Sequence, residues 1–519
     1  MRKKLLSARL PFKIAKMKYL WIIIFCFALG TAESQNRNSI WCFGDSAAID
    51  FSSGIATPIS SGMDGRGSCA TIANESGDLL FYAATMSAYS TTLAYSTFIF
   101  DQNHNIMLNG DSIFGKGWYQ ELVIVPNPAN DSTYYLFSIG VTGNDFGLKY
   151  SIIDMRLNGG LGAVTVKNVQ LQSFAMVDCM NAVKHGNGRD WWLIFRKSDF
   201  PTFTSNNDFY SYLITPNGIQ NFSVQSIGEQ NRTNLGNIKF SSHGDKMVFS
   251  SIADVVELFD FDRCTGLLSN PITIEEDPGM APYLLTWSCE FSPDASKLYV
   301  TASPSSTVLF QYNLNAPNIT SSKQTLWSIS FPQDAGGGLK RAPDNKIYLS
   351  TIYYNGINTP YPYPDSIYNT YNMNLSVINH PDSLGALCDF QPWSFYLGGK
   401  RTYIGLPNNP DYELPALAGS PCDTLVGVSE ISFQEEQSNL YVYYSPQWQT
   451  AFINANQLKG TSSKLQVFDV IGNLVFEEST KFYPPYYTKN LNCTSLAKGM
   501  YVVTLEAGGQ RLVKKFVVE

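Results

Sequence analysis

The chain has 519 residues, a formal net charge of −7 and only 15% charged residues, whereas aromatic residues make up 14%. Its length exceeds one ordinary hydrophobic core, and its acidic balance argues against a general nucleic-acid binder, which normally carries a basic face. The sequence also contains 39 glycines and 26 prolines. Aromatic and turn residues with few charges favour strands and tight turns, so we expect an all-β protein.

Residues 1–34 have the pattern of a cleaved signal peptide. A basic stretch precedes the apolar run from Tyr19 to Leu29, and the small residues Gly30 and Ala32 offer a cleavage site. The apolar run is shorter than the roughly 20 residues of a membrane-spanning helix. No later segment is long and apolar enough either, so no transmembrane segment is expected after removal of the signal.

One pattern recurs at an interval of about 50 to 60 residues, which is typical of repeat architectures. It is a strand, a polar turn with Gly, Asn or Asp, and an aromatic or β-branched return strand, which predicts a β-hairpin. The six copies lie at 72–82, 126–137, 184–194, 240–249, 291–300 and 342–349. A further strand follows each copy, at 98–103, 150–155, 210–214, 258–262, 310–314 and 375–378.

These repeats predict a β-propeller over residues 36–412, with sheets of four strands. Residues 38–54 and 386–406 lie outside the six copies. If both segments supply strands to one shared sheet, the ring closes as a seventh blade and has no open edges. Six blades is the alternative. A two-sheet sandwich is weaker, because it gives no reason for the even period.

The pattern changes after a predicted linker at 413–430. Short alternating strands with Gly-containing turns then occupy residues 431–519, and they predict a small β-sandwich. The complete fold prediction is therefore an all-β chain in which a propeller is followed by a C-terminal sandwich.

Residues 465–519 resemble the type A C-terminal sorting domain of the type IX secretion system of Bacteroidota. The resemblance is carried by the motifs at 467–469, 472–473, 496–503 and 514–518. It implies an Ig-like sandwich, the type IX secretion machinery as a partner, and a location outside the cell or on its outer surface. It assigns the sorting signal to Asp469, Gly472, Gly499, Tyr501 and Lys515. A small binding module is the alternative interpretation.

Residues 38–412 resemble a propeller family that is found in the same exported proteins. The matching segments are 41–44, 49–54, 154–160, 261–266, 291–299 and 405–408. That family has no agreed activity, so the resemblance implies a fold and a location but no chemistry.

The cysteine count permits disulfides. Nine cysteines less Cys26 of the signal leave eight, an even number in an exported chain. No C-x-x-C pair occurs, which argues against zinc. Cys264 and Cys289 flank the segment between two neighbouring repeats, so we predict a disulfide between them; buried free thiols are the alternative.

Catalytic motifs are missing from the sequence. Neither H-E-x-x-H nor G-x-S-x-G occurs, and the segment 110–117 lacks the final hydroxyl of a phosphate-binding loop. Carboxylates in predicted turns could serve glycoside hydrolysis or bind Ca²⁺, but such residues are common in turns for conformational reasons. They are Asp260, Asp262, Glu275, Glu276 and Asp277. We therefore expect a binding propeller without a cofactor; the alternative is a carbohydrate-active enzyme with acids at the propeller mouth.

The loop from Tyr353 to Tyr371 is a candidate ligand platform. Prolines restrict its backbone, and tyrosine offers a flat apolar face with a polar tip, which suits stacking on a glycan or gripping an extended peptide. The alternative is a loop packed over the propeller rim. Its tyrosines are Tyr353, Tyr354, Tyr361, Tyr363, Tyr368 and Tyr371.

Overall fold

The computed structural model consists almost entirely of antiparallel strands in the part that it describes. The described residues are 36–518 except 87–94, 116–119, 141–146, 200–201, 203, 232, 253–254, 277–285, 303–306, 331–335, 354–366, 424–438, 447–448, 457, 483 and 485. Within them, helical structure is limited to three short 3-10 helices, η1 (Asn158–Gly160), η2 (Thr320–Ser322) and η3 (Gly385–Cys388). The predicted all-β class is confirmed.

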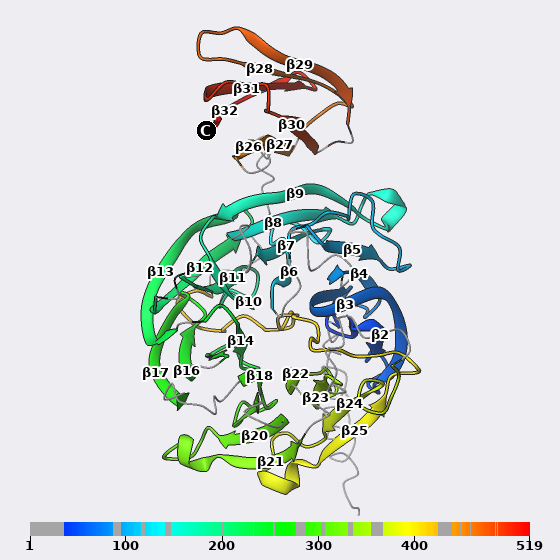
Figure 1. The fold of residues 1–519 in the computed structure, drawn as a ribbon, viewed down its shortest axis with the longest axis vertical. Helices are drawn as coiled ribbons and strands as arrows, with labels where there is room; N and C mark the ends of the chain where they lie inside the picture. The colour runs from blue at the N-terminus through cyan, green and yellow to red at the C-terminus, as the bar shows by residue number, and fades with distance from the viewer. Residues whose placement is uncertain are drawn as a thin grey trace, which may run out of the picture. The chain divides into compact units, whose positions relative to one another are not determined.

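Strands β1 to β25 form six sheets, and within each sheet the strands lie side by side in chain order. Figure 1 shows these sheets around a ring, with β6, β10, β14, β18 and β22 near its centre. This arrangement is the predicted β-propeller. The first two sheets contain β1 (Ile40–Phe43), β2 (Asp45–Asp50), β3 (Thr57–Ala73), β4 (Leu79–Met86) and β5 (Thr97–Asp101), then β6 (Leu122–Pro126), β7 (Thr133–Gly140), β8 (Gly147–Asp154) and β9 (Ala163–Gln172).

Four further four-stranded sheets complete the ring in the described part of the chain. Their strands are β10 (Met176–Lys184), β11 (Trp191–Lys197), β12 (Asn206–Thr215) and β13 (Gly218–Asn231); β14 (Gly236–Phe240), β15 (Lys246–Ser251), β16 (Val255–Asp262) and β17 (Leu267–Glu276); β18 (Thr286–Phe291), β19 (Lys297–Ala302), β20 (Thr307–Asn313) and β21 (Gln324–Ile329); and β22 (Gly336–Arg341), β23 (Ile347–Thr351), β24 (Asn374–Ile378) and β25 (Phe390–Tyr396).

The six predicted hairpins are all present, as β3–β4, β6–β7, β10–β11, β14–β15, β18–β19 and β22–β23. In the third of them, Lys184 pairs with Trp191 and Val183 with Trp192 across the turn. The polar turn residues close these hairpins, and the apolar residues that follow bury the return strand. All eight residues of β7 are buried, for example. A local sequence pattern was therefore sufficient to place each hairpin.

The two ends of the ring meet beside β2. Strand β3 pairs with β2 through residues 57–64 and with β4 through 65–73, so the first sheet has two parts. The backbone N–H of Asp45 donates to the carbonyl of Arg401 over 2.9 Å, and the Arg401 Nε donates to the Asp45 carboxylate over 2.8 Å. This contact joins the two segments only through isolated bridges at Arg401, because β25 of the second segment lies in the sheet β22–β25 and not with β1 and β2. The number of blades, seven or six, stays a prediction.

The C-terminal region is a sandwich of two sheets. One sheet has the order β26-β27-β30 and the other β29-β28-β31-β32, and apolar side chains from both sheets form one core between them. Strands β27 and β30 were not predicted. The bounds are β26 (Asn439–Ser445), β27 (Thr450–Asn456), β28 (Ser462–Phe468), β29 (Leu474–Lys481), β30 (Tyr487–Asn492), β31 (Gly499–Ala507) and β32 (Gln510–Val518).

Candidate functional site

The centre of the propeller is occupied by residues 404–422, which we call the strap. Figure 1 shows this segment in gold, crossing the middle of the ring after β25. It runs in the direction of the inner strands: Gly338, Lys340 and Arg341 of β22 contact residues 404, 409 and 411 in turn. On β10, the carbonyl of Met180 and the amine of Lys184 contact residues 408 and 412. The strap therefore runs beside β22 and β10 in their direction, as far as the last residue of each.

Asn408 links the strap to three sheets. Its side-chain amide donates to the carbonyls of Leu122 in β6, over 3.0 Å, and Met180 in β10, over 2.7 Å. Its carbonyl oxygen accepts from the Gln120 side chain over 3.1 Å, and Gln120 in turn accepts from the backbone N–H of Ile238 in β14 over 2.8 Å. Asn408 is only 3% exposed. Buried polar groups need partners, and here the strap supplies them to the inner strands.

Tyr412 anchors the strap further along the channel. Its side chain is 1% exposed, its hydroxyl donates to the carbonyl of Ile124 over 3.0 Å, and its ring meets Trp191 edge to face at 5.9 Å. The amine of Lys184 donates to its backbone carbonyl over 2.6 Å. Leu414 is buried in a core cluster that includes residues of β10, β14 and β16. A ligand that entered the channel would have to displace this packing.

The two acids of the strap face basic groups of the ring. Asp411 lies 3.4 Å from the guanidinium of Arg341, and Glu413 accepts the backbone N–H of Arg37 over 3.0 Å. Burial raises the pKa of Glu413 to about 7, against the opposing effect of Lys184. Both carboxylates are therefore held by contacts with the ring.

Lys340 is the most perturbed amine in the channel wall. Burial lowers its pKa to about 7, and nearby Lys239 acts in the same direction. Its Nζ lies 3.3 Å from the carbonyl of Asn409 and 5.3 Å from the centre of the Trp41 ring. A neutral lysine can act as a nucleophile, but strap backbone covers this one. We therefore assign Lys340 to holding the strap.

The predicted disulfide between Cys264 and Cys289 is wrong. Cys264 is bonded to Cys422 of the strap, with the Cα atoms 5.4 Å apart and a sequence separation of 158. Cys289 is a free thiol, fully buried in β18, where it contacts Ser250 and Asn237. Cys264 lies in the turn after β16, at the end of its sheet, so a residue in the middle of the next inner strand is not its neighbour. The strap brings Cys422 there instead.

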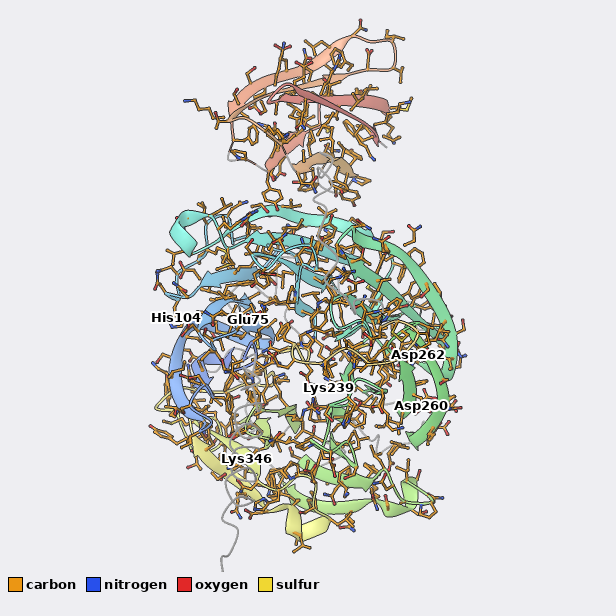
Figure 2. The ribbon with its side chains drawn as sticks, turned by 180° about the vertical axis from the view of Figure 1, so that it is seen from behind. Glu75, His104, Lys239, Asp260, Asp262 and Lys346 are labelled. Carbon is orange, nitrogen blue, oxygen red and sulfur yellow. A yellow bond between two sulfur atoms is a disulfide. The ribbon has the colours of Figure 1, made fainter. Side chains whose placement is uncertain are left out.

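The acids considered for catalysis are held in turns or on strands away from the channel. Figure 2 shows Asp260 and Asp262 toward the outer part of the ring, whereas Lys239 lies near its centre. Asp260 pairs with Lys246 at 2.9 Å, and Asp262 accepts the backbone N–H of Cys264 over 2.8 Å. Glu275 pairs with Lys323 and accepts from Tyr312, and Glu276 is exposed at the end of β17. Asp277 lies outside the described residues.

Part of the predicted tyrosine platform belongs to a row of aromatic side chains that runs from the sheet β22–β25 to β21 of the neighbouring sheet. We call Tyr353, Tyr371, Trp393 and Trp327 the aromatic row. Tyr353 stacks on Tyr371 with ring centres 5.7 Å apart, Tyr371 meets Trp393 at 4.9 Å, and Trp393 meets Trp327 at 5.4 Å. All four side chains are partly exposed. Tyr368 is half exposed beside the guanidinium of Arg401. Tyr354, Tyr361 and Tyr363 lie outside the described residues.

Trp393 has an unusual backbone conformation. Its φ angle is +48°, in the left-handed region that a tryptophan rarely adopts. Its backbone N–H donates to the hydroxyl of Ser376, and its indole N–H donates to the hydroxyl of Thr351, each over 3.0 Å. Sequence reasoning missed Trp327 and Trp393 as site residues, because the row is assembled from segments that are separate in the chain.

The five residues assigned to the sorting signal lie on one sheet of the sandwich. Gly472 has φ +89° in the turn between β28 and β29, where Asp469 accepts the backbone N–H groups of Ile471 and Asn473. Gly499 begins β31. Tyr501 is buried against Phe516, and its hydroxyl donates to the carbonyl of Ala497. Lys515 is exposed on β32.

Other common kinds of site are not found in the part of the chain that the structure describes. No cluster of three or more His, Cys, Asp or Glu side chains there is arranged to hold a metal ion. None of the helices described has the length or apolar character needed to cross a membrane.

Similarity to a known family decides the nature of the C-terminal sandwich. Residues 441–519 match the secretion system C-terminal sorting domain. This sorting domain is the region that was identified by resemblance, and it marks the chain as an exported protein of the outer surface or the medium. No curated protein shows significant sequence similarity to the chain.

Several solved structures are similar to the chain at low sequence identity. One is a quinonprotein alcohol dehydrogenase-like protein from Bacteroides thetaiotaomicron, with 12% identity and a TM-score of 0.38 over 72% of this chain and 79% of that one. An auxiliary nutrient binding protein from the same organism has 10% identity and a TM-score of 0.35, covering 60% and 73%. The Cps50 (Swd1) β-propeller domain of Myceliophteria thermophila has 10% identity and a TM-score of 0.33, covering 61% and 94%.

Proposed function

We propose that the chain is an exported binding protein, in which the sorting domain directs export and the propeller binds a ligand at the cell surface or in the medium. A signal peptide at 1–34 carries the chain across the inner membrane in this proposal, and the type IX machinery reads the C-terminal sandwich. The observation that carries the export part is the sorting-domain match at 441–519.

A binding role fits the channel better than a catalytic one. The strap fills the place where a propeller enzyme would bring its acids together, and Asp411 and Glu413 are held by contacts with the ring. A glycosidase needs two carboxyl groups about 5 to 10 Å apart on either side of a bound sugar. Asp260, Asp262 and Glu275, which were considered for that role, are occupied by a turn hydrogen bond or ion pairs. We therefore place the ligand outside the channel.

The aromatic row is our proposed ligand surface. Partly exposed aromatic rings bind apolar faces of sugars or prolines while their polar tips form hydrogen bonds. The left-handed conformation of Trp393 costs on the order of 1–3 kcal/mol, and such strain clusters at ligand sites. Two hydroxyl groups hold its backbone and indole in that position. We propose a glycan as the first ligand class and an extended proline-rich peptide as the second.

The two tryptophans of the row make binding measurable by intrinsic fluorescence. The purified protein is titrated with hexasaccharides of glucose, xylose and mannose and with a proline-rich peptide. We expect a saturable change with at least one probe, weakened at least tenfold in Trp393→Ala and Tyr371→Ala. Tyr396→Ala is the matched control, because it removes a half-exposed aromatic ring at the end of the same strand, β25, outside the row. A response that survives in Trp393→Ala, or no response to any probe, contradicts the proposed surface.

A further inference from the structure

The two parts of the strap are held in different ways. Between residues 404 and 414, buried side chains and the hydrogen bonds of Asn408 and Tyr412 anchor it in the channel. Beyond Leu414, most of the side chains are exposed. That end is held by hydrogen bonds from Arg263 to the carbonyl of Pro415 and from Leu417 to the carbonyl of Gly186, each 2.7 Å long, and by the bond between Cys264 and Cys422.

The disulfide packs against a turn of the ring. Gly186, in the turn between β10 and β11, lies directly under both sulfur atoms, and a Cβ at that position would overlap them. Arg263, next to Cys264, donates to the carbonyls of Lys184 and Pro415, while the indole of Trp192 donates to the Arg263 carbonyl over 2.9 Å. Most of these contacts are made between ring residues. The surface against which the disulfide packs is therefore formed before the strap is bonded to it.

The other cysteines of the described chain are protected from redox chemistry. Cys42, Cys69, Cys179, Cys289, Cys388 and Cys493 are free and buried. Burial raises the pKa of the Cys69 and Cys289 thiols to about 12, so their reactive thiolate forms are scarce. Cys264 and Cys422, by contrast, are partly exposed. Among the described cysteines, only Cys264 and Cys422 are therefore accessible to thiol reagents.

From this arrangement we infer that the Cys264–Cys422 disulfide is a redox-controlled lock on the end of the strap, closed by thiol–disulfide exchange after export and opened by reductants. One of the two thiolates attacks a sulfur of an external protein or small-molecule disulfide and forms a mixed disulfide. The second thiolate then displaces the external sulfur, so the Cys264–Cys422 bond forms. Both electrons pass to the external disulfide, which leaves as two thiols.

The lock has a local consequence. When it opens, the hydrogen bonds from the Arg263 guanidinium to Pro415 and from the backbone N–H of Leu417 to Gly186 still link residues 415–422 to the ring, and the anchored part up to Leu414 stays in the channel. The end of the strap then becomes mobile and accessible to proteases, while the propeller remains folded. An oxidising environment outside the cytoplasm keeps the end closed.

Thiol counting tests the lock on the mature protein. The native oxidised protein is expected to react with no maleimide, because the free thiols are buried. The native protein treated with a phosphine reductant is expected to react with two, at Cys264 and Cys422, and the unreduced denatured protein with six. Labelling of Cys289 in the native reduced protein, or eight reactive thiols in the unreduced denatured protein, overturns the proposal.

Hydrogen exchange then tests what the lock does. Reduction is expected to speed amide exchange at Leu417 by at least tenfold and to leave exchange at Asn408 and Tyr412 unchanged. The variant Cys264→Ser/Cys422→Ser should show the fast exchange with or without reductant. If that variant does not fold, reduction of the wild-type protein provides the same comparison. Exchange that is unaffected by reduction, or that accelerates along the whole strap, contradicts a lock confined to its end.

Discussion

The side-chain amide of Asn408 donates a hydrogen bond to the backbone carbonyl of Met180, which lies 228 residues earlier in the chain. The same amide binds Leu122, so a single strap residue satisfies inner strands of two sheets. We expect Asn408→Ala to lower the free energy of unfolding by about 2–4 kcal/mol, because it leaves several buried polar groups without partners. Urea unfolding of the propeller measures this. Asn217→Ala, in an exposed turn, is the control and should change stability by less than about 0.5 kcal/mol.

Breaking the Cys264–Cys422 bond should destabilise the propeller without changing its fold. The bond closes a loop of 158 residues, for which the chain-entropy model gives roughly 5 kcal/mol, an upper figure for a native disulfide. Urea unfolding with and without reductant measures the loss. Reductant should have no effect on Cys264→Ser/Cys422→Ser, since no other disulfide is present among the described cysteines. An equal loss in the variant would point to a different bond.

Glu257 predicts a pH dependence of stability. Its side chain is 1% exposed, accepts the backbone N–H of Glu229 through both oxygens, and has its pKa raised to about 7 by burial, against the opposing effect of Arg196. A carboxyl whose pKa is higher in the folded state stabilises the fold below its unfolded pKa. That contribution is lost as the pH rises from about 4.5 to about 7.

Glu257→Gln should therefore raise the free energy of unfolding at pH 8, on the order of 1–3 kcal/mol, because the glutamine carries no buried charge. At pH 4 the variant and the wild-type protein should differ little. Thermal unfolding across this range checks the prediction. Glu276→Gln, at an exposed position on β17, is the matched control and should have no pH-dependent effect. A stabilisation that is the same at both pH values would mean that charge is not its cause.

Export should depend on the last two strands. Deleting residues 500–519 removes nearly all of β31 and the whole of β32, two of the four strands in one sheet of the sandwich. We expect the truncated protein to keep a folded propeller and to accumulate in the periplasm, which fractionation with immunodetection and protease resistance can show. Deleting the exposed turn residues 217–218 is a control that leaves the sandwich intact. Normal release of the 500–519 deletion would contradict the sorting role.

Much of the fold was predictable because its units are local. In each hairpin, two strands and their turn are consecutive in the chain, within 30 residues at most, so the alternation of apolar side chains and the turn chemistry determine the pairing. Lys184 and Trp191 are one such pair. Strands β27 and β30 of the sandwich were missed, because their apolar alternation is weak and polar residues interrupt it. The aromatic row was only partly anticipated, since Trp327 and Trp393 reach Tyr371 through the packing of separate segments.

The sequence by itself therefore determined the all-β class, the repeated hairpins and the sorting domain, all of which are encoded by neighbouring residues. Only the tertiary structure decided that the strap threads the channel, that Asp411 and Glu413 are held by the ring, and that Cys264 pairs with Cys422 and not with Cys289. The physical reason is distance along the chain. Cys422 and Asn408 have partners 158 and 228 residues earlier in the chain, and no local sequence pattern indicates which residues of the ring will be their neighbours.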